Sequence, residues 1–121
     1  MFNVKDEKIV LAIKALENPT FDAGIIQSIL KLLRTKLLFT DPEKAKLAVS
    51  LGAINKMNSL LDHSSTEIVK EAVWILTNLA ASESKYVGII RTLGIEYKAL
   101  DLIVKGNDQI KEIVKNHNEV L

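Results

Sequence analysis

An internal repeat of forty-two residues constrains the fold of this chain more than any other feature of its sequence. When the sequence is shifted by that length against itself, identical residues align and apolar character persists at other positions, such as Leu33 with Ile75 and Leu47 with Ile89. The identical pairs include Ile26 with Ile68, Thr35 with Thr77, Leu37 with Leu79, Leu51 with Leu93, Gly52 with Gly94, Lys56 with Lys98 and Leu60 with Leu102. A repeat of this length with only helical patterns predicts stacked helical units that bury their apolar faces against one another.

Start and stop signals predict about eight helices and no strand longer than a few residues. Asp41 is a typical N-cap and Pro42 suits a first helical position, whereas Gly52 and Gly94 allow sharp turns between helices. The predicted helices cover residues 5–17, 22–39, 42–50, 53–62, 66–82, 85–92, 94–106 and 107–121. We therefore predict an all-α fold.

The length and composition fit one domain over residues 1–121, of which 48% are hydrophobic. We divide it into a partial repeat at about 1–40, a repeat at about 41–82 and another at about 83–121. The formal net charge of +1 argues against a nucleic-acid binder held by a broad basic surface. The chain has no cysteine and no apolar run long enough for a bilayer, and its N-terminus lacks signal-peptide features. We expect an intracellular protein, cytoplasmic or nuclear, without a membrane partner.

The segment 66–82 carries the most distinctive pattern. On a helical wheel, one narrow arc holds four apolar residues, namely Ile68, Ala72, Leu76 and Leu79. Roughly the opposite side holds Glu67, Glu71, Trp74 and Asn78. The only tryptophan therefore lies on the polar face, where we interpret it as part of a binding surface. Two other interpretations stay open: a neighbouring helix or loop could shield Trp74, and Asn78 could be a solvated surface residue.

Enzymatic activity is the competing class of function, and the sequence gives it little support. The chain has no nucleophile motif and no phosphate-binding glycine loop. Its two histidines, His63 and His117, stand without other metal ligands at suitable spacing. We expect no catalysis, no metal and no cofactor.

The order of short helix, glycine and two longer helices resembles an armadillo repeat. Residues Glu71 to Ala80, EAVWILTNLA, resemble the third helix of such a repeat in the importin-α (karyopherin-α) family, and Leu51-Gly52-Ala53-Ile54 resembles its first helix junction. The resemblance implies an α-solenoid, a right-handed superhelix, of roughly three repeats here. In that family the third helices line a concave groove that binds lysine-rich nuclear localisation signals.

The resemblance also implies roles for individual residues. Trp74 would pack on lysine stems, Asn78 would hydrogen-bond the peptide backbone, and Glu67 and Glu71 would attract a basic peptide. The position that matches Trp74 in the preceding repeat is Leu32, and the one that matches Asn78 is Lys36. In the following repeat one position drops out after Gly106, so the matching residues are Lys115 and Glu119. The chain therefore departs from the several Trp/Asn pairs of the family.

We predict a non-catalytic protein-interaction module that binds an extended peptide in its concave groove or joins a larger assembly. The alternative is an importin-α-like nuclear-import adaptor that recognises a basic signal through Trp74 and Asn78. Because so short an array leaves apolar helix faces at its ends, we also expect a second copy or a larger complex to cover them. Arg34 matches the predicted core residue Leu76, so its helix must be rotated or partly uncovered there.

Overall fold

The computed structural model describes residues 4–38 and 41–104, and over these ranges the chain forms helices and no strand. The all-α prediction is confirmed for this part of the chain. The helices are α1 (Val4–Ala15), α2 (Ala23–Lys36), α3 (Pro42–Ser50), α4 (Ala53–Leu60), α5 (Thr66–Ser82), α6 (Ser84–Thr92) and α7 (Ile95–Val104). The eighth predicted helix, at 107–121, lies outside the described residues.

Side-chain caps set where several helices begin, as the sequence indicated. The Asp41 side chain accepts a hydrogen bond from the Lys44 backbone N–H at the start of α3, and Pro42 is the first residue of that helix. Ser65 caps α5 by accepting from the Ile68 N–H.

The ends of three helices were predicted too late. α1 ends at Ala15 and not at 17, because two turn residues follow it. α2 ends at Lys36 and not near 39, because the chain leaves the helical conformation at Leu37, whose side chain is buried in the core. α4 ends at Leu60 and not at 62, where two turn residues follow before the cap of α5.

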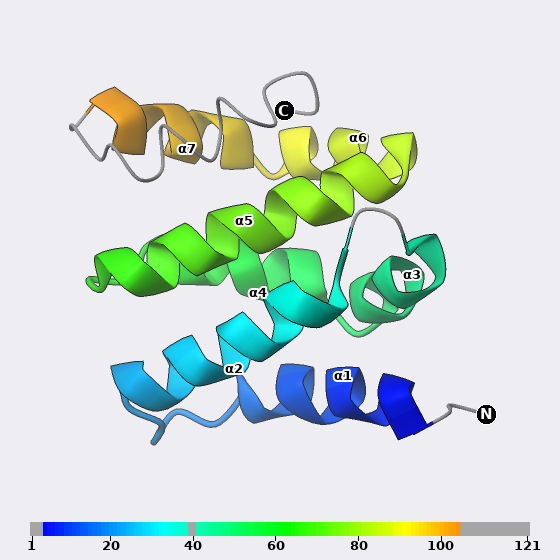
Figure 1. Ribbon diagram of the computed structural model, residues 1–121. Helices are drawn as coiled ribbons and strands as arrows, with labels where there is room; N and C mark the ends of the chain where they lie inside the picture. The colour runs from blue at the N-terminus through cyan, green and yellow to red at the C-terminus, as the bar shows by residue number, and fades with distance from the viewer. Residues whose placement is uncertain (1–3, 39–40, 105–121) are drawn as a thin grey trace.

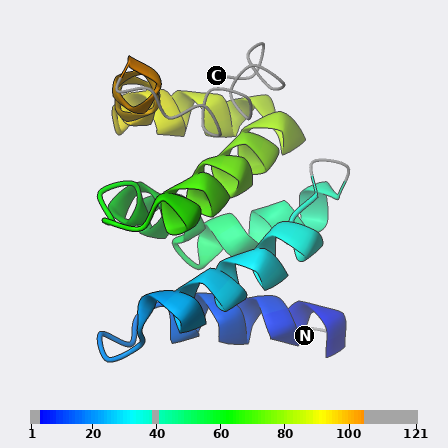
Figure 2. The ribbon, with the colours of Figure 1, turned by 60° about the vertical axis from the view of Figure 1, so that its left-hand side comes forward.

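The helices stack in three layers along the chain (Figures 1 and 2). α1 and α2 form the first layer, α3, α4 and α5 form the second, and α6 and α7 form the third. α2 and α5 lie side by side and run in the same direction. α5 also packs against α4 and α6, so it is the central helix of the described structure.

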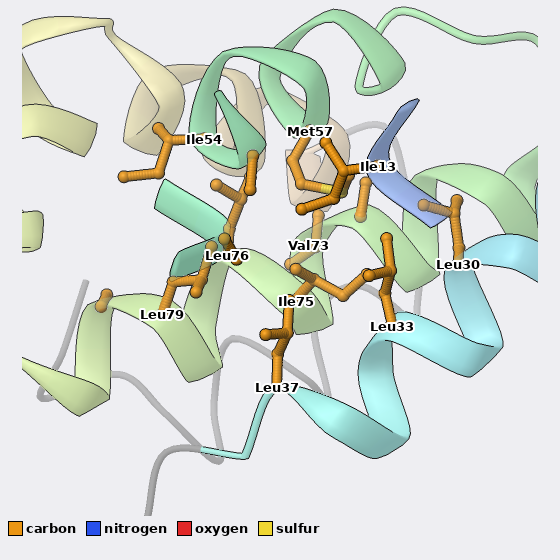
Figure 3. Packing of buried hydrophobic residues seen from close by; sticks show 14 of the residues in the cluster. Ile13, Leu30, Leu33, Leu37, Ile54, Met57, Val73, Ile75, Leu76 and Leu79 are labelled. Atoms are coloured by element: carbon orange, nitrogen blue, oxygen red, sulfur yellow. The ribbon is translucent and has the colours of Figure 1, made fainter. Parts of the chain in front are cut away.

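The core lies where α2, α4 and α5 meet. Leu33 of α2 and Leu37, the residue that follows this helix, reach the region of Ile75 and Leu76 of α5, and Met57 of α4 closes the cluster (Figure 3). Each of these five side chains is at most 1% exposed. Burial of these apolar groups supplies most of the free energy that holds the layers together.

Two glycines turn the chain between helices, as predicted. Gly52 has φ +89° before α4, and Gly94 has φ +74° before α7. Side chains other than glycine rarely adopt this left-handed backbone conformation. The positive φ angle therefore explains why glycine stands at the same position in both repeats.

We expect Gly52→Ala to lower the free energy of unfolding by about 1–2 kcal/mol, the cost of a left-handed conformation for an L-residue. A Cβ at Gly52 would meet no atom within 4 Å, so the effect isolates backbone strain from steric overlap. Urea denaturation measures it. Gly88→Ala is the matched control, because Gly88 lies within α6 and has equal space; this change should leave stability the same or raise it. Equal effects of the two changes would contradict the interpretation.

Leu79→Ala should destabilise the protein by about 2–5 kcal/mol, since it removes a fully buried side chain from the central helix. Thermal or urea denaturation followed by circular dichroism would measure the loss. Leu11→Ala is the control, because Leu11 is 60% exposed on α1, and its effect should stay within about 0.5 kcal/mol. A small effect at Leu79 would mean that α5 is not central to stability.

Candidate functional site

The carboxylate of Glu71 is buried inside the protein and pairs with a cation from the preceding layer. Only 2% of its side chain is exposed, and Glu71 Oε2 accepts a hydrogen bond from Arg34 Nε at 2.6 Å. A buried carboxylate without a partner is strongly unfavourable. Arg34 therefore satisfies a charge that the packing of α5 against α2 would otherwise isolate.

The same guanidinium lies over the ring of Trp74. Arg34 Cζ is 4.4 Å from the ring centroid, a distance typical of cation–π stacking. Trp74 itself is half-buried and packs against the hydrophobic core. The open interpretation that a neighbouring element shields Trp74 is therefore correct in part: the shield is one side chain of α2.

Sequence reasoning did not include Arg34 among the site residues, although it carried a signal. The repeat register matched Arg34 with Leu76, which is fully buried, so a charge there required an uncovered position or a partner. The structure supplies both, because 29% of the Arg34 side chain is exposed and the remainder reaches Glu71 and Trp74. The partner could not be identified from the sequence, since the two residues are thirty-seven positions apart.

Asn78, one helical turn after Trp74, is only 5% exposed. The interpretation of Asn78 as a solvated surface residue is therefore wrong. Among residues 4–38 and 41–104, its side-chain amide makes no hydrogen bond. No fully buried side-chain nitrogen or oxygen of the described residues lacks a partner, so the Asn78 amide atoms keep a narrow contact with solvent. The amide is thus available to a ligand.

The other predicted site residues occupy different environments. Glu67 pairs with Lys70 of the same helix, Nζ to Oε2 2.7 Å, so its charge is also neutralised within the protein. Leu32, 39% exposed, and Lys36, half-buried, lie on α2, one layer before Trp74. The structure brings together Arg34, Glu71 and Trp74, with Asn78 one turn further along α5. Lys115 lies outside the described residues.

Metal and membrane chemistry find no support in the described part of the chain. No group of three or more His, Cys, Asp or Glu side chains there is arranged to hold a metal ion. His63 serves the loop before α5, where its Nδ1 accepts from the Ser65 backbone N–H at 2.9 Å. None of the described helices has both the length and the apolar character needed to cross a membrane.

Comparison with known families identifies one part of the chain. The sequence model of the Armadillo/beta-catenin-like repeat matches residues 41–81, which include α3, α4 and nearly all of α5 with Trp74 and Asn78. Repeats of this family generally act as protein-binding scaffolds without enzymatic activity. None of the curated proteins matches this sequence.

A double-mutant cycle tests the contact between the layers. Arg34→Gln and Glu71→Gln should each lower the free energy of unfolding by about 1.5–3 kcal/mol, the range for a hydrogen bond to a charged group. The double variant should lose less than the sum, because one change removes the partner that the other leaves unsatisfied. Urea denaturation gives all four values.

Lys85→Gln is the control for this cycle. Lys85 pairs with Glu83, but its side chain is 61% exposed, so the change should cost less than about 1 kcal/mol. Additive losses at Arg34 and Glu71 would show that the two side chains do not depend on each other.

Proposed function

We propose that this chain is a non-catalytic protein-interaction module, an armadillo-type α-solenoid that binds an extended peptide segment along α2 and α5. The proposal extends the armadillo character of residues 41–81 to the flanking helices, whose layers stack on it (Figures 1 and 2). In this arrangement α2 and α5 are equivalent helices of consecutive repeats, and they form one continuous surface. The right-handed superhelix of about three repeats is part of the proposal.

The observation that carries the proposal is the amide of Asn78. The Asn78 amide has only a narrow contact with water and accepts or donates no hydrogen bond among the described residues. An extended peptide offers both a backbone N–H and a carbonyl, which an amide side chain can bind together. The ring of Trp74, one turn away, offers a flat apolar surface beside this point. Binding of a peptide would satisfy the amide.

Nuclear import remains the alternative, and it rests on the Trp74/Asn78 pair. The charges at the site favour the general interaction module over this alternative. In the importin-like mechanism a ligand lysine packs on the tryptophan, but here Arg34 already lies over that ring, 4.4 Å from its centroid. Glu71 and Glu67, which would attract a basic ligand, are paired with Arg34 and Lys70.

A larger assembly is the second part of the proposal. Large apolar side chains are exposed on the first and third layers, with Leu11 and Ile25 60% and 44% exposed on α1 and α2, and Tyr97 and Leu100 70% and 54% exposed on α7. In repeat proteins such end faces pack against another layer or are polar. We propose that a second copy or a larger intracellular complex covers them.

Titration of Trp74 emission tests peptide binding, because Trp74 is the only tryptophan. The probes are three peptides of equal length in which serine alternates with aspartate, lysine or glutamine. At least one should change the emission in a saturable way. Asn78→Ala should then weaken its binding about tenfold, the effect of losing roughly one hydrogen bond.

Asn55→Ala is the matched control, because Asn55 is exposed on α4 and the change removes an amide away from α5. It should leave the affinity unchanged. The proposal fails if none of the three peptides binds, or if the two asparagine variants have the same effect.

A further inference from the structure

The guanidinium of Arg34 is held in place but only partly used. Its Nε donates to Glu71 at 2.6 Å, and its Cζ lies over the ring of Trp74. Arginine carries five N–H donors, and the four on its terminal nitrogens make no hydrogen bond within the described ranges 4–38 and 41–104. Because 29% of the side chain is exposed, a cationic donor group, fixed by an acid and a ring, remains accessible to solvent.

The charges around this group are mainly positive. Lys31 lies three residues before Arg34 on the same helix, is exposed, and has no ion pair among the described residues. Lys36, also without a described ion pair, adds positive charge further along α2. The only nearby carboxylates that the contacts identify are Glu71, paired with Arg34, and Glu67, paired with Lys70. The unbalanced charge is therefore positive.

From these contacts we infer that the peptide bound along α2 and α5 is acidic, and that Arg34 receives one of its carboxylates. The inference rests on the proposed function and names the class of ligand. The carboxylate of an aspartate or glutamate side chain would accept from the terminal nitrogens of Arg34, while the peptide backbone would bind Asn78. A guanidinium that already stacks on a ring loses little conformational freedom when it binds a carboxylate. Lys31 would stabilise a second acidic side chain.

A basic peptide would gain little at the same place. To reach Glu71 or the covered face of Trp74, a ligand lysine or arginine would have to displace Arg34. The exchange replaces one cation by another, leaves Arg34 without its partner, and adds repulsion from Lys31. Glu71 and Trp74 thus form a cation-binding site that Arg34 of the same chain already occupies. Because Arg34 occupies this site, the surface favours an acidic ligand and not a basic one.

The test compares the aspartate–serine and lysine–serine peptides by Trp74 emission in the full chain. The aspartate peptide should bind at least about tenfold more tightly, and its affinity should fall as salt is added, because exposed charges are screened. Arg34→Lys should weaken the aspartate peptide about tenfold, since lysine keeps the charge opposite Glu71 but lacks the planar fork. Lys31→Gln should weaken it by roughly threefold.

Lys46→Gln is the matched control, because Lys46 is exposed on α3, outside the α2–α5 surface, and should leave the affinity unchanged. Urea denaturation of Arg34→Lys verifies that the variant is folded. Tighter binding of the lysine peptide, still dependent on Asn78, would overturn the acidic ligand and leave the proposed function standing. An aspartate affinity that Arg34→Lys does not change would overturn the role of Arg34. No binding of any peptide would overturn both proposals.

Discussion

The burial of α5 is the constraint on which the rest of this structure depends. Eleven of its seventeen residues are buried, because α2, α4 and α6 all pack against it. Its apolar side chains form the centre of the core (Figure 3). A helix so enclosed has almost no surface on which polar side chains reach water freely. The polar groups that are buried on it must therefore find a partner in the protein, or remain available to one outside it.

The three buried polar residues of α5 meet this requirement in different ways. Thr77 donates to the Trp74 carbonyl of its own helix at 2.7 Å, a local solution that needs no neighbouring element. Glu71 depends on Arg34 of the preceding layer, so its charge ties α5 to α2. Asn78 has no such partner within the described residues. Thr77 and Glu71 therefore stabilise the fold, whereas the amide of Asn78 remains available to a ligand.

The contact of Trp74 with Arg34 shows that a residue on a neighbouring helix can change which ligand a sequence motif binds. From the sequence alone, Glu71, Trp74 and Asn78 were expected to receive a basic peptide. Arg34 occupies a position that is apolar in the next repeat, where Leu76 stands, and its guanidinium contacts both the Glu71 carboxylate and the Trp74 ring. A motif on one helix therefore does not determine the charge of its ligand. That charge also depends on the side chain that the adjacent layer contributes.

The sequence by itself determined the helical class, the repeat length, the cap at Asp41 and the glycine turns, because these depend on local periodicity and backbone conformation. It also placed Trp74 and Asn78 on one face of one helix. Only the tertiary structure decided that Arg34 covers Trp74 and pairs with Glu71, and that Asn78 is nearly buried. A helical wheel describes the faces of one helix, whereas these contacts depend on how α2 packs beside α5. The distance between two packed helices, and the shift of one along the other, depend on the packing of the whole core.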